Sequence, residues 1–192
     1  RPIDRIEQLG EEAVASAFRA RLMSIGPMMH GGGQWIMGNA ITAGGCFVLY
    51  TKKRFDAHDV WQLVADGVVT SVSTIGDAMA RPLAEHLVAE PRPTYDLSML
   101  FAIGNGGAPL STGVREQIRE ALPNVAILDS FGASETGAAG ARADDGSAMS
   151  SPKFAMSDDT TVLSEEGRQC GVGEVGKLAR SGNIPLGYFK DP

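Results

Sequence analysis

Strand-like and helix-like segments alternate through the middle of the chain. Short apolar runs rich in β-branched residues predict strands, and the longer amphipathic segments between them predict helices. The predicted strands span residues 46–50, 68–75, 97–103 and 125–128, and the predicted helices span residues 57–66, 76–89 and 111–121. Such alternation is typical of parallel strands joined by right-handed crossovers. We therefore predict an α/β fold, with a mostly parallel sheet and flanking helices.

Several residues mark the expected ends of these segments. Asp56 and Ser111 are placed to cap two of the helices, and Gly67 to end the first. The run 46–50 is apolar throughout, which predicts a strand buried on both faces.

The residues before this region predict further helices. Apolar residues recur with roughly helical spacing over residues 3–22, and another helix is expected at 36–43. The three consecutive glycines at 31–33 disfavour regular structure in the segment between these two helices.

The chain changes character after residue 140. Small and polar residues follow, and candidate strands at 160–163 and 174–180 predict a small antiparallel β subregion near the C-terminus. We expect residues 1–140 to form the α/β part of a domain and residues 141–192 a β-rich continuation of it. Because the chain begins at Arg1 rather than Met, we also expect a fragment of a longer protein.

Composition excludes several classes of protein. A net charge of −6 disfavours nucleic acid or an anionic membrane as a partner held by bulk charge. No stretch is long enough to span a membrane. Cys46 and Cys170 lie far apart without metal-binding spacing, so we expect a reducing, cytoplasmic compartment. Membrane association and a homo-oligomeric state are left open.

Two glycine-rich loops, 104–109 and 131–137, each follow a predicted strand. In an open α/β sheet both would lie at the carboxyl edge, where ligands bind. The first loop has neither the P-loop pattern nor the dinucleotide-binding pattern.

The second loop has residue types that suit a nucleotide. Phe131 offers a flat face for a base, and Gly132 lets backbone approach a ligand. Ser134 can bond a phosphate oxygen, and Glu135 is a hard oxygen ligand for Mg²⁺. The alternative interpretation is a surface turn rich in Gly and Ser.

Four stretches in order resemble motifs of the adenylate-forming enzymes, which include acyl-CoA synthetases, luciferases and nonribosomal peptide adenylation domains. They are the Pro-Met-Met-His run at 27–30, the Gly-Gly-Ala-Pro-Leu run at 106–110, the Asp-Ser-Phe-Gly-Ala-Ser-Glu run at 129–135, and the Gly-Glu to Asp-Pro run at 173–192. Residues 75–81 and the last stretch look most like actinobacterial acyl-CoA synthetases, including the branch that activates fatty or steroid side-chain acids.

The resemblance implies a two-step reaction. A carboxylic acid substrate attacks the α-phosphorus of Mg-ATP to give an acyl-adenylate and pyrophosphate, and coenzyme A then displaces AMP to give a thioester. The implied cofactors and co-substrates are therefore ATP, Mg²⁺ and coenzyme A.

The resemblance also implies roles for residues of this chain. Phe131 would stack on adenine, with Asp129 near its amino group, and Gly132 and Ala133 would border the acyl group. Ser134 would contact phosphate, Glu135 would hold Mg²⁺ and His30 would lie near the substrate carboxylate. The adenine pocket would be lined by Gly107, Ala108 and Pro109.

Three residues depart from the family pattern. Phe131 stands where Tyr is common, and Ser134 replaces the commoner Thr. Trp35 lies five residues after His30, whereas a gating Trp in some relatives lies four after, so we expect Trp35 to pack in the core instead.

The family's phosphate loop, ribose-binding Asp and C-terminal domain with its catalytic Lys are expected outside this chain. We therefore predict that the chain alone completes neither half-reaction.

Other interpretations stay open. The parent protein could be an adenylation domain that serves a carrier protein or another acceptor. It could also be a non-catalytic nucleotide-binding module, although a metal carboxylate such as Glu135 has no use in a degenerate site. A purely structural α/β domain is the third alternative. A lone histidine such as His30 is more often structural than catalytic.

Overall fold

The computed structural model describes residues 5, 7–8, 10–11, 19–89, 91, 93–143, 153–182 and 184–190. The strands of these regions are β1 (Arg21–Ser24), β2 (Cys46–Leu49), β3 (Ser71–Thr74), β4 (Ala102–Asn105), β5 (Ala126–Ala133), β6 (Gly137–Ala143), β7 (Ala155–Met156), β8 (Thr160–Leu163) and β9 (Lys177–Arg180). The helices are α2 (Gly31–Thr42), α3 (Ala57–Asp66), α4 (Gly76–Val88) and α5 (Thr112–Ala121).

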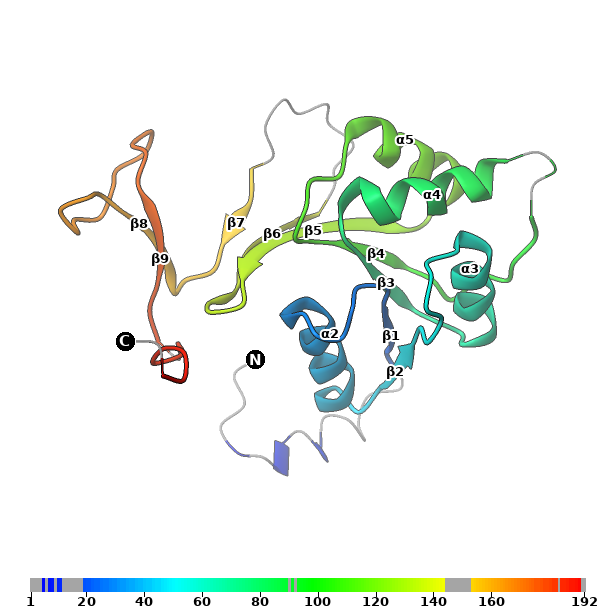
Figure 1. The fold of residues 1–192 in the computed structure, drawn as a ribbon, viewed down its shortest axis with the longest axis horizontal. Helices are drawn as coiled ribbons and strands as arrows, with labels where there is room; N and C mark the ends of the chain where they lie inside the picture. The colour runs from blue at the N-terminus through cyan, green and yellow to red at the C-terminus, as the bar shows by residue number, and fades with distance from the viewer. Residues whose placement is uncertain are drawn as a thin grey trace.

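Seven strands form one sheet in the order β2-β1-β3-β4-β5-β6-β7 (Figure 1). Strands β1 to β5 pair in parallel, whereas β6 and β7 add antiparallel strands at one side. Strands β8 and β9 form a separate antiparallel pair. The predicted α/β fold with a small antiparallel region is confirmed.

The helices lie on both faces of the sheet because the direction of the crossovers changes. The connection from β1 to β2 runs one way along the sheet, and the later crossovers run the other way. Right-handed crossovers therefore place α2 on one face and α3, α4 and α5 on the other, as Figure 1 shows.

The main core lies between α3, α4, α5 and the central strands. Trp61 of α3 is only 1% exposed, and its indole Nε1–H donates to the carbonyl oxygen of Leu83 in α4 at 3.0 Å. That bond satisfies the one polar group of a large apolar side chain. The buried core residues of the strands are Met23, Val72, Ile103 and Ile127.

The predicted helix caps are confirmed. Asp56 accepts a hydrogen bond from the Asp59 amide at 3.0 Å, and α3 ends at Gly67. The Ser111 hydroxyl accepts from the Val114 amide at 3.5 Å at the start of α5. Each cap satisfies an amide that the first helical turn leaves without a partner.

Several predicted boundaries are wrong. Residues 21–22 were expected in a helix but begin β1, and most of that expected helix lies outside the described residues. Residues 97–101 were expected in a strand, but β4 starts at Ala102 after a turn in which the Leu100 amide donates to the Leu97 carbonyl at 3.0 Å.

Two other predictions are wrong for reasons of packing. β2 is an edge strand with Leu49 48% exposed, so it is not buried on both faces. The glycines 31–33 form the first turn of α2 instead of an irregular segment. Gly33 is buried there, where a Cβ would lie 3.1 Å from the Pro27 carbonyl oxygen.

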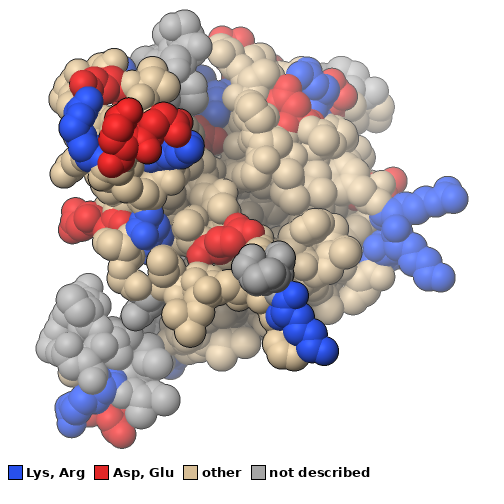
Figure 2. Space-filling model, turned by 60° about the vertical axis from the view of Figure 1, so that its left-hand side comes forward, with Lys and Arg blue, Asp and Glu red and all other residues tan. Residues whose placement is uncertain are grey.

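No helix within the described residues is long and apolar enough to cross a bilayer. On the face shown in Figure 2, acidic and basic side chains lie next to each other in several places, among uncharged residues. On the small β8–β9 unit, Lys177 pairs with Glu165 and Arg168 pairs with Glu174, each at 2.8 Å.

Candidate functional site

The loops at the carboxyl edge of the parallel strands lie next to one another. The Ile25 amide, just after β1, donates to the Ser73 carbonyl of β3 at 3.1 Å. A Cβ on Gly26 would lie 3.0 Å from the Ile75 side chain. The loop that leads to His30 therefore lies against the loop that leads into α4.

The start of α4 in turn lies against the first glycine-rich loop. Gly76 has a φ of +55°, and a Cβ there would lie 2.6 Å from the Ala108 Cβ and 2.8 Å from the Pro109 carbonyl oxygen. The Asp77 amide donates to that carbonyl at 3.3 Å. Only glycine combines this backbone conformation with so close an approach.

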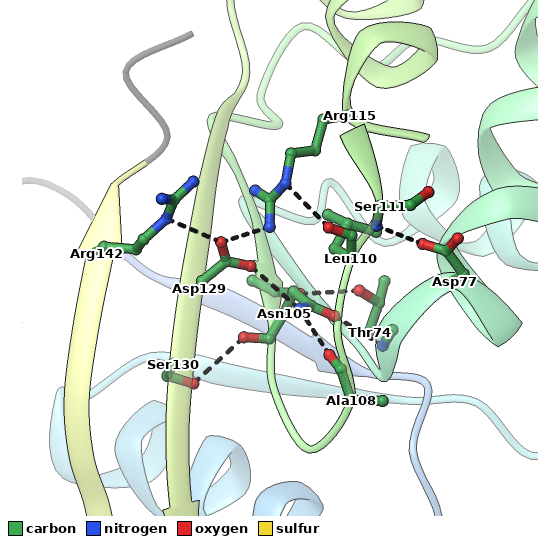
Figure 3. Close-up of polar contacts among 12 residues, drawn as sticks. Thr74, Asp77, Asn105, Ala108, Leu110, Ser111, Arg115, Asp129, Ser130 and Arg142 are labelled. Carbon is green, nitrogen blue, oxygen red and sulfur yellow. Dashed lines mark hydrogen bonds and ion pairs between the residues drawn. The ribbon is translucent and has the colours of Figure 1, made fainter. Parts of the chain in front are cut away.

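A row of buried polar side chains crosses four strands at this edge (Figure 3). We call it the polar row. Its members are direct cross-strand neighbours: Thr74, Asn105, Asp129 and Arg142. Thr74, Asn105 and Asp129 are 1%, 5% and 3% exposed. Such a row needs internal partners, because buried polar groups without them are costly.

Asp129 has partners for both carboxylate oxygens. Its Oδ2 pairs with Arg142 Nε at 3.2 Å and with Nη2 of Arg115, on α5, at 2.6 Å. Its Oδ1 accepts a hydrogen bond from the side-chain Nδ2 of Asn105 at 3.1 Å. The Arg115 guanidinium also donates to the Leu110 carbonyl at 3.1 Å, so it connects Asp129 to the end of the first loop.

The second glycine-rich segment is a β-hairpin, so the prediction of an irregular flexible loop is wrong. β5 continues to Ala133, and only residues 134–136 form the turn into β6. The strand continues because β6 supplies antiparallel hydrogen bonds. The pairing shifts between Phe131 and Gly132, where a Cβ on Gly132 would overlap the Gly137 carbonyl.

The side chain of Phe131, in β5, is half-buried. Its ring meets the ring of Phe154 edge-on at 5.0 Å between centroids. A Cβ on Gly140 would overlap the Phe131 ring, so this glycine lets the ring lie on the β6 backbone. The ring is thereby held in a defined orientation beside the polar row.

The turn exposes Ser134 and Glu135. The Tyr188 hydroxyl donates to Glu135 Oε1, and this hydrogen bond lowers the pKa of Glu135 and raises that of Tyr188. Arg180 of β9 donates to the carbonyls of Thr136 and Ala138, and its ion pair with Asp159 at 2.6 Å holds it there. The turn is therefore attached to the small β8–β9 unit.

Glu135 is a single carboxylate. It therefore suits Mg²⁺ that brings other ligands with it better than it suits a metal ion held by protein side chains alone. No cluster of three or more His, Cys, Asp or Glu side chains occurs in the described part of the chain. Glu135 is an exposed carboxylate with a lowered pKa, so it is ionised at neutral pH. One such carboxylate is sufficient for Mg²⁺ that arrives with phosphate ligands.

The structure brings most of the predicted site residues to one edge of the sheet. Gly107, Ala108 and Pro109 are exposed in the first loop, beside the start of α4. His30 is exposed at the N-cap of α2, and its side chain makes no capping hydrogen bond. The prediction that Trp35 packs in the core is wrong, because its side chain is 39% exposed and rests on Gly31.

Sequence reasoning missed Asn105, Arg115 and Arg142, which surround Asp129, and the contacts of Tyr188 and Arg180 with the hairpin turn. Asn105 had a signal, since it stands at the end of a predicted strand within a glycine-rich loop. The arginines had none, because their roles depend on strand pairing.

Comparison with known proteins gives a consistent result. The family described as "AMP-binding enzyme" matches residues 5–189. The 3-oxocholest-4-en-26-oate--CoA ligase of Rhodococcus rhodochrous is 39% identical over 174 residues, which are 87% of this chain and 31% of that protein. A medium/long-chain-fatty-acid--CoA/3-oxocholest-4-en-26-oate--CoA ligase of Mycolicibacterium smegmatis is 38% identical over 196 residues, 99% of this chain and 35% of that protein.

Solved structures show the same fold at lower identity. The long-chain-fatty-acid-CoA ligase of Archaeoglobus fulgidus has a TM-score of 0.72 at 20% identity, over 96% of this chain and 39% of that one. The O-succinylbenzoate coenzyme A synthetase of Bacillus subtilis, solved with ATP and magnesium ion, has a TM-score of 0.72 at 21% identity, over 96% of this chain and 38% of that one. The chain spans about a third of the length of the curated relatives it matches.

Proposed function

The chain belongs to the AMP-binding enzyme family, and on that premise we propose that the whole protein is an acyl-CoA ligase. It would activate a carboxylic acid with Mg-ATP to an acyl-adenylate and then transfer the acyl group to coenzyme A. This chain would supply the adenine-side loop and the Ser134–Glu135 turn of the adenylation site.

The observation that carries this proposal is the convergence of separate motif segments on one edge of the sheet. Gly76 brings the start of α4 against Ala108 and Pro109, and the Asn105–Asp129 hydrogen bond joins that loop to β5. Segments about fifty residues apart in the sequence, from Gly76 to Asp129, therefore lie at the place where open α/β sheets bind ligands.

Each predicted residue keeps a chemical role that its surroundings allow. Phe131 would present its ring to adenine, and its edge-on contact with Phe154 sets the orientation of that ring. Gly107, Ala108 and Pro109 are exposed and would form the opposite wall, because the loop they belong to lies against Ser130 at Gly106. Asp129 would lie behind this wall, near the adenine amino group, and Gly132 would border the acyl group. His30 would meet the substrate carboxylate from the neighbouring loop.

Ser134 and Glu135 would act on the triphosphate. The Ser134 hydroxyl is exposed in the turn and can donate to a phosphate oxygen. Glu135 would hold Mg²⁺, which when bound offsets the charge that builds up on the phosphate oxygens. Arg180 holds the turn that carries both residues, so their placement does not depend on the turn alone.

We propose a fatty or steroid side-chain acid as the substrate, because the similar curated proteins are named as ligases for such acids. We also propose a reducing location such as the cytoplasm, because Cys46 and Cys170 are both free thiols.

Carboxylate-dependent ATP–pyrophosphate exchange by the full-length protein tests the proposal. The acids should include medium-chain, long-chain and steroid side-chain acids. Exchange with one class would establish adenylation and identify the substrate class together. Exchange with none of them, by folded protein with Mg²⁺ present, would refute the ligase and leave the nucleotide-binding module.

Glu135→Gln provides the residue-level test, with Glu165→Gln as the matched control on the β8–β9 unit. The charge loss at Glu135 should reduce Mg²⁺-dependent exchange by about 100-fold or more, as loss of an electrostatic contact in the transition state typically does. The same change at the exposed Glu165 should leave exchange within about twofold. Equal effects of the two substitutions would exclude Glu135 as the metal ligand.

A further inference from the structure

We propose that Asn105 is a positioning residue that sets the distance and orientation of loop 106–110 relative to Phe131. In this arrangement Asp129 acts on the nucleotide through Asn105 and Arg115, by fixing the loop at two points. The inference rests on the proposed function, since it concerns the wall of the same adenylation site.

The Asn105 side chain makes hydrogen bonds through both its oxygen and its nitrogen. Its Oδ1 accepts from the Gly76 amide at 2.7 Å, and its Nδ2 donates both to the Ala108 carbonyl and to Asp129 Oδ1, each at 3.1 Å. Three segments that are distant in the sequence thus meet on one carboxamide: the start of α4, loop 106–110 and β5.

Asp129 fixes which way this carboxamide faces. If the amide were reversed, its oxygen would face the Asp129 carboxylate and the Ala108 carbonyl, and its nitrogen would face the Gly76 N–H. All three contacts would become repulsive, so only one orientation is compatible with a charged Asp129. The two arginines on Oδ2 keep that charge compensated within the buried row.

Two side chains hold the loop, one at its middle and one at its end. Asn105 binds the carbonyl of Ala108, and Arg115 binds the carbonyl of Leu110, while both side chains also contact Asp129. Asp129 and Phe131 lie two residues apart on β5, so their side chains share one face of the strand. These hydrogen bonds therefore fix the position of the exposed segment 107–109 relative to β5, the strand that carries the proposed adenine-stacking ring.

This arrangement predicts a specific effect on nucleotide binding. Removal of the Asn105 carboxamide would free the Ala108 carbonyl and the Gly76 amide, and the loop would no longer be kept at a set distance from Phe131. A contact made equally in the ground state and the transition state affects KM and leaves kcat unchanged. A merely structural role would instead reduce the amount of active enzyme, which lowers kcat and leaves KM for ATP unchanged.

The test compares Asn105→Ala and the milder Asn105→Ser with wild type in the full-length protein. Both variants should raise KM for ATP in pyrophosphate exchange, Asn105→Ala by about tenfold, and leave KM for the acid within about twofold. The dissociation constant for AMP, measured by calorimetry, should rise by a similar factor. If Asn105→Ala does not fold, Asn105→Ser supplies the same two measurements.

Thr70→Val is the matched control. Thr70 is also buried, at 1% exposed, and its hydroxyl makes two hydrogen bonds with the Arg21 backbone at the opposite edge of the sheet. This change should lower stability and leave both KM for ATP and AMP affinity unchanged. Unchanged AMP affinity in a folded Asn105 variant, or equal weakening by Thr70→Val, would overturn the inference.

The two proposals can fail separately. If wild type shows no exchange with any acid yet binds AMP, the ligase proposal fails, and AMP affinity of the Asn105 variants still decides the role of Asn105. If wild type exchanges and the variants match it in AMP affinity, the inference about Asn105 fails and the ligase stands.

Discussion

Substitution of Gly76 by alanine should destabilise the chain strongly, because two independent penalties act at this position. The residue has a φ of +55°, which costs an L-residue about 1–2 kcal/mol. The added Cβ would also lie 2.6 Å from the Ala108 Cβ and 2.8 Å from the Pro109 carbonyl oxygen. Overpacking of this kind typically costs about 1–3 kcal/mol.

The two terms together give an expected loss of about 2–5 kcal/mol in the free energy of unfolding. Urea unfolding followed by the fluorescence of Trp61, which is 1% exposed and packs against α4, would measure it. Gly38→Ala is the matched control, because Gly38 lies within α2 and a Cβ there would meet nothing within 4 Å. Alanine should stabilise that helix by about 0.5–1 kcal/mol.

A loss below about 1 kcal/mol for Gly76→Ala would refute this reasoning, because it would be no more than the backbone term alone. It would mean that loop 106–110 yields freely and is not held against α4. A loss of similar size in Gly38→Ala would show that the assay reports something other than local packing.

Two further predictions concern hydrogen bonds made by side chains outside the polar row. Burial opposes ionisation of Asp77, but its hydrogen bonds with Ser111 and the Arg81 guanidinium prevail and lower its pKa. A lowered folded-state pKa stabilises above the unfolded value of about 4, and that stability is lost as pH falls through the folded value. The stability difference between wild type and Asp77→Asn should therefore shrink below about pH 4 in acid titration of the unfolding midpoint, and a constant difference would contradict the assignment. Tyr95→Phe should cost about 1–2 kcal/mol in urea unfolding, since the hydroxyl bonds both His58 Nδ1 and His86 Nε2 at 2.7 Å, and a loss under about 0.5 kcal/mol would show that these bonds do not join α3 to α4.

The parts of the fold that could be predicted are those set by local chemistry. Asp56 and Ser111 cap their helices as expected because an N-cap depends only on residues within one turn. β2 was predicted to be buried on both faces because its composition resembles a central strand. Whether a strand lies at the edge depends on strand order, and no local pattern contains that order.

The hairpin at residues 126–143 shows the same limit in another form. Gly132, Ser134 and Gly137 are residues that favour turns, so the segment was predicted to be a loop. In the structure Gly132 allows close backbone contact between two paired strands, Gly137 takes a φ of +70° where β6 begins, and only residues 134–136 turn. Local propensity favoured a loop, and long-range pairing with β6 overrode it.

The residues of the candidate site fall into the same two groups: those whose chemistry is local, and those whose contacts depend on strand pairing. The roles proposed for Phe131 and Glu135 come from the motif itself, because the chemistry of these side chains can be read from the sequence, and they stay predictions. Asn105 and Arg142 could not be predicted, since they meet Asp129 only through the parallel register of β4 with β5 and the antiparallel register of β6. A one-residue slip in either pairing would turn these side chains to the opposite face of the sheet.

This dependence on register gives the polar row a second consequence. Arg115 of α5 pairs with Asp129, but Asp129 has its full set of partners only when β4 and β6 both pair with β5 in the observed register, because Asn105 and Arg142 are then its direct neighbours. A slipped pairing would leave a buried carboxylate short of partners, and breaking a buried ion pair typically costs about 3–5 kcal/mol. The same contacts that would place the nucleotide-binding loop therefore also disfavour misregistered sheets. An apolar row at this edge could pack equally well but would not discriminate between registers so sharply.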